Sequence, residues 1–276
     1  MKINYIATLE SPFHHGAGTS GNTQRLRTQE VVLEDGSLAM VPFLSANSIR
    51  HGLRDALAWH LAKTLDLADG TLTKTAVSLI WSGGAVTTTG AQTNLDLTRR
   101  ANAALPMLGL LGYAAQSDIT AGTARVSDGI LVCEENHARI PVQATHKAAH
   151  YRGEEFGTRH DLDTTPAARF IELADDAVNA STQMIWSTQI LKPGAELAGS
   201  METDAAATGE HEKTLAAAFH LWAPGGVAFL AAKTATGYGK ARITTEEEVS
   251  NEVPWLTQHY LDHADEIVEI VRELAA

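Results

Sequence analysis

One amphipathic segment constrains the fold of this chain more than any other feature. Four aliphatic residues recur at every fourth position, namely Ile49, Leu53, Leu57 and Leu61. This spacing predicts a helix with one buried face. Ser45 or Asn47 can cap its first turn with a side-chain oxygen. Arg50 and Arg54 lie one turn apart on the other face of the predicted helix.

Segments with strand character surround this helix. Residues 2–9 alternate between polar and apolar side chains, and residues 28–41 predict a hairpin around a turn at 34–37. Further strands are predicted at 122–133, with an interruption at Asp128-Gly129, and at 183–191, 195–201, 227–232 and 241–244; further helices are predicted at 211–222 and 254–276. This mixture predicts one α+β domain spanning 1–276, in which residues 64–104 form an insertion of loops with room for one helix.

The charge of the chain restricts where nucleic acid can bind. A formal net charge of -12 excludes a protein that coats nucleic acid with its whole surface, because Lys and Arg carry such binding. The basic residues nevertheless cluster, at Arg25 and Arg27, Arg50 and Arg54, Arg99 and Arg100, Lys147 and Arg152, and Lys240 and Arg242. Any nucleic-acid site is therefore expected to be a local basic groove on an acidic body.

Cysteine content and hydropathy indicate the compartment. The single Cys133 excludes an internal disulfide and a metal site built from cysteines alone, so a reducing compartment is expected. No run approaches the ~20 apolar residues of a membrane span. The chain is therefore predicted to be cytoplasmic and without a membrane partner.

Histidines raise the possibility of a metal site. His14 and His15 are adjacent, and His146 and His150 have the i, i+4 spacing that lets two imidazoles share one zinc ion. Neither pair has the accompanying Glu of an HExxH arrangement, and no cysteine pair exists in the sequence. We therefore predict no metal and no cofactor.

A glycine-rich segment near the N-terminus could bind either a dinucleotide or a phosphate backbone. Gly16, Gly18 and Gly21 have G-x-G-x-x-G spacing, but no apolar helix follows, as a dinucleotide-binding fold would require. Arg25 and Arg27 follow instead, which suits contact with a phosphate backbone. The chain contains neither a Walker loop nor a G-x-S-x-G nucleophile elbow.

Two further elements could bind anions. Arg50 and Arg54 could face a phosphate beside the helix N-terminus, or could form a solvated face that pairs with Asp55. The segment Gly237 to Lys240 could offer backbone N–H groups to phosphates, or could merely close a hairpin. The sequence leaves both choices open.

Three motifs in order resemble the RAMP superfamily, the RNA-binding proteins of CRISPR systems. The helix entry is carried by Pro42, Ser45, Ser48, Ile49, Arg50, Gly52, Leu53 and Arg54; a leucine-glycine turn is carried by residues 108–112, followed by a strand at 125–129; and a glycine-rich loop is carried by Thr236-Gly237-Tyr238-Gly239-Lys240. The resemblance implies an α+β fold with a ferredoxin-like, RRM-type core. It also implies that the basic stretch beginning at Gln143 belongs to a projecting thumb hairpin at 143–182.

The resemblance further implies the role of a repeated backbone subunit of a type IV or type III CRISPR effector complex. Its expected partners are guide RNA, target nucleic acid paired to that RNA, copies of itself in a filament, and other effector subunits. The expected RNA-binding residues are Gly16, Gly18, Arg25, Arg27, Ser45, Asn47, Ser48, Arg50, Arg54, Lys147, Arg152, Gly237, Tyr238, Gly239 and Lys240.

The first loop bears on catalysis. In type III backbone subunits an Asp in this loop cleaves target RNA, whereas residues 14–27 contain no acid here. The chain is therefore predicted to be non-catalytic. Two alternatives stay open: a guide-processing endoribonuclease that uses His14 or His15, and a protein-only structural subunit that contacts its neighbours through the C-terminal helix.

Overall fold

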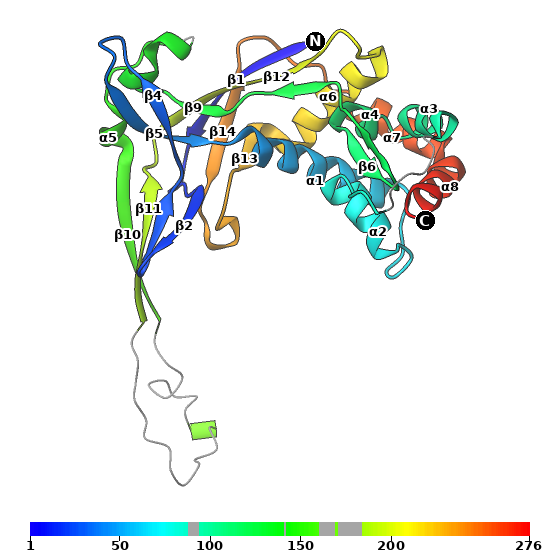
Figure 1. Ribbon diagram of the computed structural model, residues 1–276, viewed down its shortest axis with the longest axis horizontal. Helices are drawn as coiled ribbons and strands as arrows, with labels where there is room; N and C mark the ends of the chain where they lie inside the picture. The colour runs from blue at the N-terminus through cyan, green and yellow to red at the C-terminus, as the bar shows by residue number, and fades with distance from the viewer. Residues whose placement is uncertain (88–93, 141, 160–168, 171–183) are drawn as a thin grey trace.

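A central antiparallel sheet organises the computed structural model, which describes residues 1–87, 94–140, 142–159, 169–170 and 184–276 (Figure 1). Its strands are β1 (Lys2–Leu9), β4 (Thr28–Val32), β5 (Leu38–Leu44), β8 (Ala124–Val126), β9 (Gly129–Leu131), β12 (Glu196–Thr203), β13 (Val227–Phe229) and β14 (Lys240–Thr245). They follow the order β13-β14-β1-β12-β9-β5-β4, and β8 also pairs with β12. The predicted hairpin at 28–41 and the strand interrupted at Asp128-Gly129 are both confirmed.

Two long helices pack on this sheet and complete the core of the fold. α1 (Ala46–Thr64) follows the β4–β5 hairpin, and α6 (Gly209–Trp222) lies in the chain between β12 and the β13–β14 hairpin. The chain thus runs β1-α1-β9-β12-α6-β14, and the four strands lie in the order β14-β1-β12-β9. This is the connectivity of a ferredoxin-like fold. The predicted α+β fold is confirmed.

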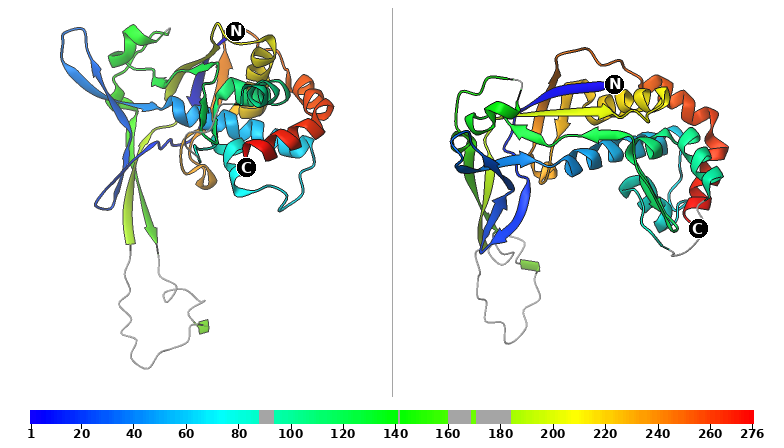
Figure 2. Two further views of the ribbon diagram at one scale, coloured as in Figure 1. Left: turned by 45° about the vertical axis from the view of Figure 1, so that its right-hand side comes forward. Right: turned by 45° about the horizontal axis from the view of Figure 1, so that its top comes forward.

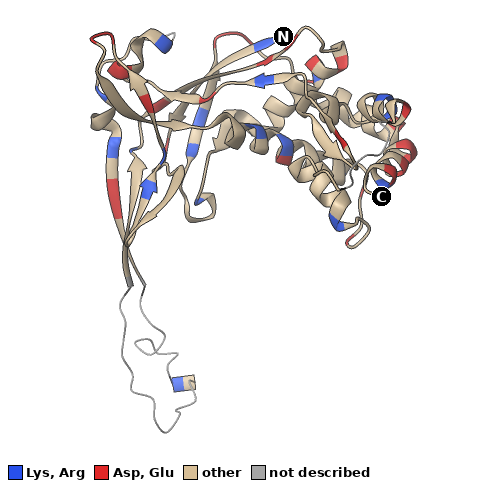
Figure 3. Cartoon of the chain, viewed as in Figure 1, with Lys and Arg blue, Asp and Glu red and all other residues tan. Residues whose placement is uncertain are grey.

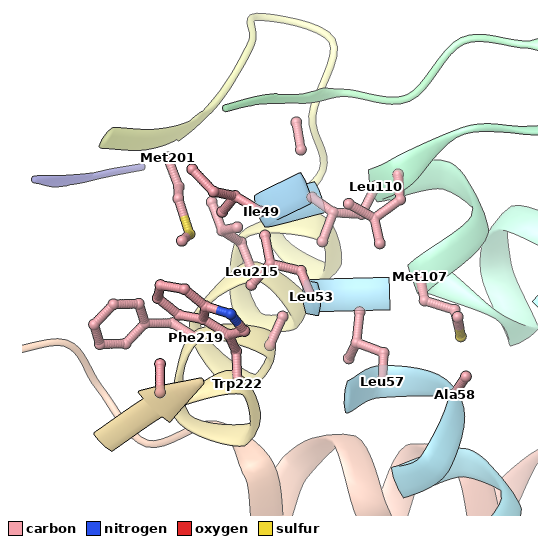
Figure 4. Packing of buried hydrophobic residues seen from close by; sticks show 14 of the residues in the cluster. Ile49, Leu53, Leu57, Ala58, Met107, Leu110, Met201, Leu215, Phe219 and Trp222 are labelled. Carbon is pink, nitrogen blue, oxygen red and sulfur yellow. The ribbon is translucent and has the colours of Figure 1, made fainter. Parts of the chain in front are cut away.

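The core lies between these helices and one face of the sheet. Figure 4 shows Leu53 of α1 beside Leu215 of α6, with Leu57 further along α1 in the same cluster and Met201 of β12 nearby. The three leucines are fully buried. Burial of each such side chain stabilises the fold by about 2 kcal/mol. The four-residue spacing therefore identified the packing face of α1 correctly.

A helical lobe extends from this core (Figure 1). Its elements are α2 (Lys74–Val77), the π-helical turn η1 (Ser78–Ser82), α3 (Leu95–Ala104), α4 (Pro106–Leu111), α7 (Val253–Asp262) and α8 (Ala264–Leu274), together with the small sheet of β6 (Tyr113–Ala115) and β7 (Asp118–Thr120). The expectation of one helix in residues 64–104 was wrong, because Thr73 and Asn94 each cap a separate helix. The single helix expected at 254–276 was also wrong, because the backbone at His263 leaves the helical region between α7 and α8.

A second sheet carries the projecting hairpin (Figures 1 and 2). It consists of β2 (Gly16–Ser20), β3 (Thr23–Leu26), β10 (Arg152–Arg159) and β11 (Met184–Leu191), in the order β10-β11-β3-β2. The glycine-rich segment expected to be a loop therefore contains the β2–β3 hairpin. β10 and β11 pair antiparallel and extend away from the body, at the position expected for the thumb. Residues 160–168 and 171–183 of the predicted thumb lie outside the described residues.

Short elements connect these parts. They are the one-turn helix α5 (Ala148–Tyr151) and the 3-10 turns η2 (Glu134–Arg139), η5 (Pro224–Gly226) and η6 (Thr234–Thr236). Within the described ranges, none of the helices combines the length and the apolar composition needed to cross a membrane.

Candidate nucleic-acid interface

Three segments that are far apart in sequence meet at the base of the projecting hairpin. Phe13 and Leu191 exchange backbone hydrogen bonds of 2.9 Å, and the carbonyl of His14 accepts a hydrogen bond of 3.1 Å from the N–H of Ala232. Lys233 donates from its Nζ to Thr188 Oγ1 at 3.1 Å. The segment before β2, the strand β11 and the loop before β14 therefore form one junction.

Tyr238 fastens the glycine-rich loop to β10. Its hydroxyl donates a short hydrogen bond to the Glu155 carboxylate, and Lys233 Nζ lies 5.5 Å from the centre of its ring. Burial, followed by the hydrogen bond with Glu155, raises the pKa of Tyr238 to about 12. Sequence reasoning missed both Lys233 and Glu155. Lys233 adopts a left-handed backbone conformation, which no glycine or asparagine signals in the sequence.

The glycine-rich loop does not form the expected phosphate cradle. The N–H groups of Gly237, Tyr238 and Gly239 donate to Thr234 O, Lys233 O and Pro12 O at 3.1, 3.2 and 2.7 Å. The loop therefore closes a hairpin, which was the other choice that the sequence left open.

Lys240 is also occupied. Its backbone N–H donates to Ser11 Oγ at 2.9 Å, and its ammonium lies 2.9 Å from a Glu10 carboxylate oxygen. Arg242 forms an ion pair of 2.8 Å with the same carboxylate. These two cations, with Lys240 the larger cause, hold the pKa of Glu10 below its usual value. Lys240 is thus a paired cation in this structure.

The N-terminus of α1 already donates a hydrogen bond to a carboxylate of the same chain. Ser45 Oγ accepts a hydrogen bond of 3.4 Å from the N–H of Ser48, which confirms the predicted cap. The N–H of Ala46 donates to Asp128 Oδ1 at 2.7 Å. Asn47 is exposed and Ser48 is half-buried. Because a carboxylate at a helix N-terminus satisfies the same N–H groups that would bind phosphate, Asp128 occupies the expected phosphate position.

Arg50 and Arg54 require a correction. Arg54 is only 8% exposed and donates from Nη2 to Leu111 O and Gly112 O, at 3.1 and 2.6 Å. Arg50 donates to Ala124 O and Leu111 O, at 2.9 and 2.7 Å. Burial, with a smaller effect of the Arg50 charge, lowers the pKa of Arg54 to about 10, so it stays protonated at pH 7. Both guanidinium groups bind backbone carbonyls inside the fold, so the pair does not face an external phosphate.

The two adjacent histidines of the first segment have different surroundings. His14 is buried, and its Nδ1 donates to Gln189 O at 2.8 Å. His15 is half-buried; its Nε2 accepts from the N–H of Ser45 at 3.3 Å and lies 3.1 Å from Ser45 Oγ. Burial, with smaller contributions from Arg27 and His14, lowers the pKa of His15 to about 4. His15 is therefore neutral at pH 7, with its proton on Nδ1.

Four of the expected cations remain available at the thumb base. We call Arg25, Arg27, Lys147 and Arg152 the thumb-base cations; all four are exposed. The Arg27 side chain donates to Gly16 O at 3.2 Å, whereas the side chains of the other three form no hydrogen bond or ion pair with any other described residue. Gly16 and Gly18 lie on β2, the neighbour of the strand that carries Arg25, and nothing lies within 4 Å of the place where a Gly18 side chain would begin.

Strand alternation separates these cations from the glycine-rich loop. Glu155 faces Tyr238, so Arg152, three residues earlier on β10, faces the opposite side of the sheet. Gln24 accepts from Thr188, which also contacts Lys233, so Arg25 points to the same side as Arg152. Arg25 and Arg152 thus lie on the face of the β10-β11-β3-β2 sheet opposite to Tyr238. Figure 3 shows Lys and Arg along these strands together with acidic residues of β10, and it shows both acids and bases on the helices at the other end of the view.

The histidines near the thumb stack on each other. The rings of His146 and His150 lie 4.2 Å apart between centres. Across the described ranges, no group of three or more His, Cys, Asp or Glu residues is arranged to hold a metal ion.

Comparisons with known proteins address the fold. No protein-family model matches the chain, and no curated protein matches its sequence. Solved structures do match. A chain of the structure described as "Type IV-B CRISPR Complex" is similar with a TM-score of 0.60 and 15% sequence identity, over 91% of this chain and 92% of that chain. Over nearly its whole length, the chain therefore has the fold of a chain from a CRISPR complex.

Proposed function

We propose that this chain is a guide-RNA-binding backbone subunit of a type IV CRISPR ribonucleoprotein effector complex in the cytoplasm. In this role it holds guide RNA through sugar-phosphate contacts and presents it for pairing with target nucleic acid. Its protein partners are other effector subunits and copies of itself.

The observation that carries this proposal is the likeness in fold. The likeness to a chain of a type IV-B CRISPR complex covers 91% of this chain and 92% of that chain, so it extends well beyond a small common core. Fold alone does not assign function. The arrangement of charge therefore has to supply the second part of the argument.

The thumb-base cations supply that support. Arg25, Lys147 and Arg152 are exposed and are not paired with any other described residue, on a chain whose net charge is -12. Unpaired cations on an acidic protein are the groups that can neutralise phosphates without first breaking an internal ion pair. The β2–β3 hairpin, which carries Arg25, presents exposed residues from Ala17 to Asn22, where backbone can approach an RNA strand closely.

The absence of catalysis is part of the proposal. The first segment, residues 14–27, contains no Asp or Glu that could hold a catalytic metal. His14 is buried against Gln189, and His15 accepts from the backbone of Ser45. A general base needs a lone pair within reach of the substrate hydroxyl. These contacts favour a binding subunit over a guide-processing ribonuclease.

A matched pair of triple variants tests the proposal. Arg25, Lys147 and Arg152 are changed to Ala in one variant; Lys2, Arg99 and Arg272, three exposed cations elsewhere on the described surface, are changed to Ala in the control. Each variant loses the same charge. Binding of fluorescein-labelled single-stranded RNA is measured by anisotropy over a range of salt concentrations.

The thumb-base variant is expected to bind RNA about tenfold more weakly, with a salt slope reduced by about 2, because each single-strand phosphate contact contributes about 0.7. The control variant should retain most of its affinity. Equal losses in both variants would contradict the assignment. Cleavage of repeat RNA that disappears in a His14→Ala, His15→Ala variant would favour the ribonuclease instead.

A further inference from the structure

A pocket of about 320 Å³ lies between α1 and the loop before β14. One wall comes from α1, another from Trp222 at the end of α6, and the third from the segment between Phe229 and Thr234. We call it the α1 pocket. None of the thumb-base cations lines it. Its volume is at the lower end of the range for small-molecule sites, so it suits one planar group rather than an extended chain.

The indole of Trp222 brings an unsatisfied donor to this pocket. The side chain is only 9% exposed, and its N–H donates to no other described residue. Gly52, which also lines the pocket, leaves this edge of the ring uncovered, since a Cβ at Gly52 would lie 3.0 Å from Trp222 Nε1. Buried donors in folded proteins nearly always have a partner. An acceptor carried by a ligand would supply the partner that the chain does not.

The other polar side chains of the pocket are unused as well. Ser48, His51, Asp55 and Thr234 line it, and none of these side chains forms a hydrogen bond or ion pair with another described residue. Phe229 is 56% exposed, so its ring is available to stack on a planar ligand. The pocket therefore combines an aromatic wall, a carboxylate that accepts hydrogen bonds, and several donors.

Among planar biological groups, guanine matches this set of partners. It carries two acceptors, O6 and N7, on one edge, and an amino group beside a ring N–H on another. The Trp222 N–H and a hydroxyl can donate to the acceptors, while the Asp55 carboxylate can accept both N–H groups at once. Adenine would place a ring nitrogen lone pair against one carboxylate oxygen, and uracil has no amino group. The carboxylate therefore favours guanine over the other bases.

We propose that the α1 pocket binds a guanine base, which Trp222 and Asp55 recognise through hydrogen bonds while Phe229 stacks on its ring. The base belongs either to a free guanine nucleotide or to an unstacked guanosine of an RNA strand. In the second case the site deepens the proposed function and rests on it. In the first case the site is independent of RNA.

The indole N–H groups give a readout at the pocket itself. The chain contains five tryptophans, so a nitrogen–proton correlation spectrum of the isotope-labelled full chain shows five indole peaks. Phe substitutions at Trp59, Trp81, Trp186 and Trp255, all more exposed than Trp222, identify the Trp222 peak by exclusion without disturbing the core. The protein is then titrated with the monophosphates of guanosine, inosine and adenosine, which share the same ribose and phosphate.

Guanosine monophosphate is expected to shift the Trp222 peak saturably. Inosine monophosphate, which lacks only the amino group, and adenosine monophosphate should need about tenfold higher concentrations, because a bidentate contact to a base edge contributes discrimination of this order. Asp55→Asn should weaken binding of guanosine monophosphate about tenfold and so remove its advantage over inosine monophosphate. Asp69→Asn, at an exposed position beyond the end of α1, loses the same charge and should bind like the unchanged protein.

Oligouridylate with and without one guanosine separates the two sources of the base. A guanosine-containing strand that moves the Trp222 peak would assign the base to RNA, whereas a strand that leaves this peak in place would assign it to a free nucleotide. A Trp222 peak that guanosine monophosphate does not move, or that all three monophosphates move equally, would overturn the proposal. The thumb-base triple variant should still bind guanosine monophosphate, so failure of the proposed RNA binding and failure of this site are distinguishable.

Discussion

The carboxylate of Asp128 accepts a hydrogen bond of 2.7 Å from the backbone N–H of Ala46, the first residue of α1. Through this bond the connection between β8 and β9 caps α1, since the first turn of α1 contains no acid of its own. Asp128→Ala is expected to lower the free energy of unfolding by about 1–2 kcal/mol, because a helix N–H loses its partner and the helix dipole loses a compensating charge. Asp128→Asn keeps an acceptor and should lose less. Urea unfolding measures both; equal losses would indicate that only the charge matters.

Arg54 gives a second prediction about stability. Its guanidinium satisfies the carbonyls of Leu111 and Gly112 from a buried position. Arg54→Met should lower the free energy of unfolding by about 3 kcal/mol, because a buried cation is removed, the carbonyl of Gly112 loses its charged donor and the carbonyl of Leu111 keeps only Arg50. RNA affinity of the folded variant should stay within about twofold of the unchanged protein, since no phosphate contact is lost. Thermal unfolding and anisotropy separate the two effects, and a folded variant with greatly weakened RNA binding would contradict the structural role.

The same arginine illustrates what the sequence can and cannot reveal. The four-residue repeat of apolar side chains in α1 correctly placed Ile49, Leu53 and Leu57 in the core, because the apolar face of a helix can be read from its local sequence. The same repeat placed Arg54 on the polar face of α1, where the sequence predicted that it would contact either solvent or a phosphate. Its real partners lie 57 and 58 residues away, at Leu111 and Gly112. No local pattern reports such distant carbonyls.

In the candidate interface, too, some features could be predicted from the sequence and others depend on the assembled fold. The presence of Arg25, Lys147 and Arg152 as cations was visible in the sequence, and they remain exposed. The pairing of Lys240 with Glu10 was not, because it depends on β14 lying beside β1. The separation of Arg152 from Tyr238 by the two faces of one sheet depends likewise on strand register, which only the assembled fold defines.

His15 predicts how stability depends on pH. Its pKa falls from 6.5 to about 4 in the folded chain, chiefly through burial. The unfolded chain therefore takes up this proton first, so stability is lost as pH falls from about 6.5 to about 4 and changes no further through His15 below that. The full shift corresponds to about 3 kcal/mol, and solvent screening of this half-buried side chain lowers the expected loss to the order of 2 kcal/mol. His15→Gln keeps an acceptor for Ser45 but cannot titrate, so urea unfolding between pH 7 and pH 4 should show a shallower dependence. An unchanged dependence would assign the titration to other groups.

Two glycines of the loop before β14 allow strain and steric conflict to be compared. Gly237 and Gly239 both have positive φ, of 88° and 74°. A Cβ at Gly237 meets nothing within 4 Å, whereas a Cβ at Gly239 would lie 2.1 Å from the carbonyl oxygen of Leu230. Gly237→Ala should therefore lower the free energy of unfolding by about 1 kcal/mol, through backbone strain alone.

Gly239→Ala should cost more, about 3 kcal/mol, because the backbone must also move and the bonds of Gly239 to Leu230 and Pro12 must lengthen. Gly237→Asn serves as the control, since asparagine tolerates the left-handed region. Chemical unfolding of the three variants measures the order. This order of losses tests the close contact between Gly239 and Leu230, which follows β13. That contact helps to keep Tyr238 against Glu155. Equal losses at the two glycines would mean that Gly239 and Leu230 are farther apart than in the structure.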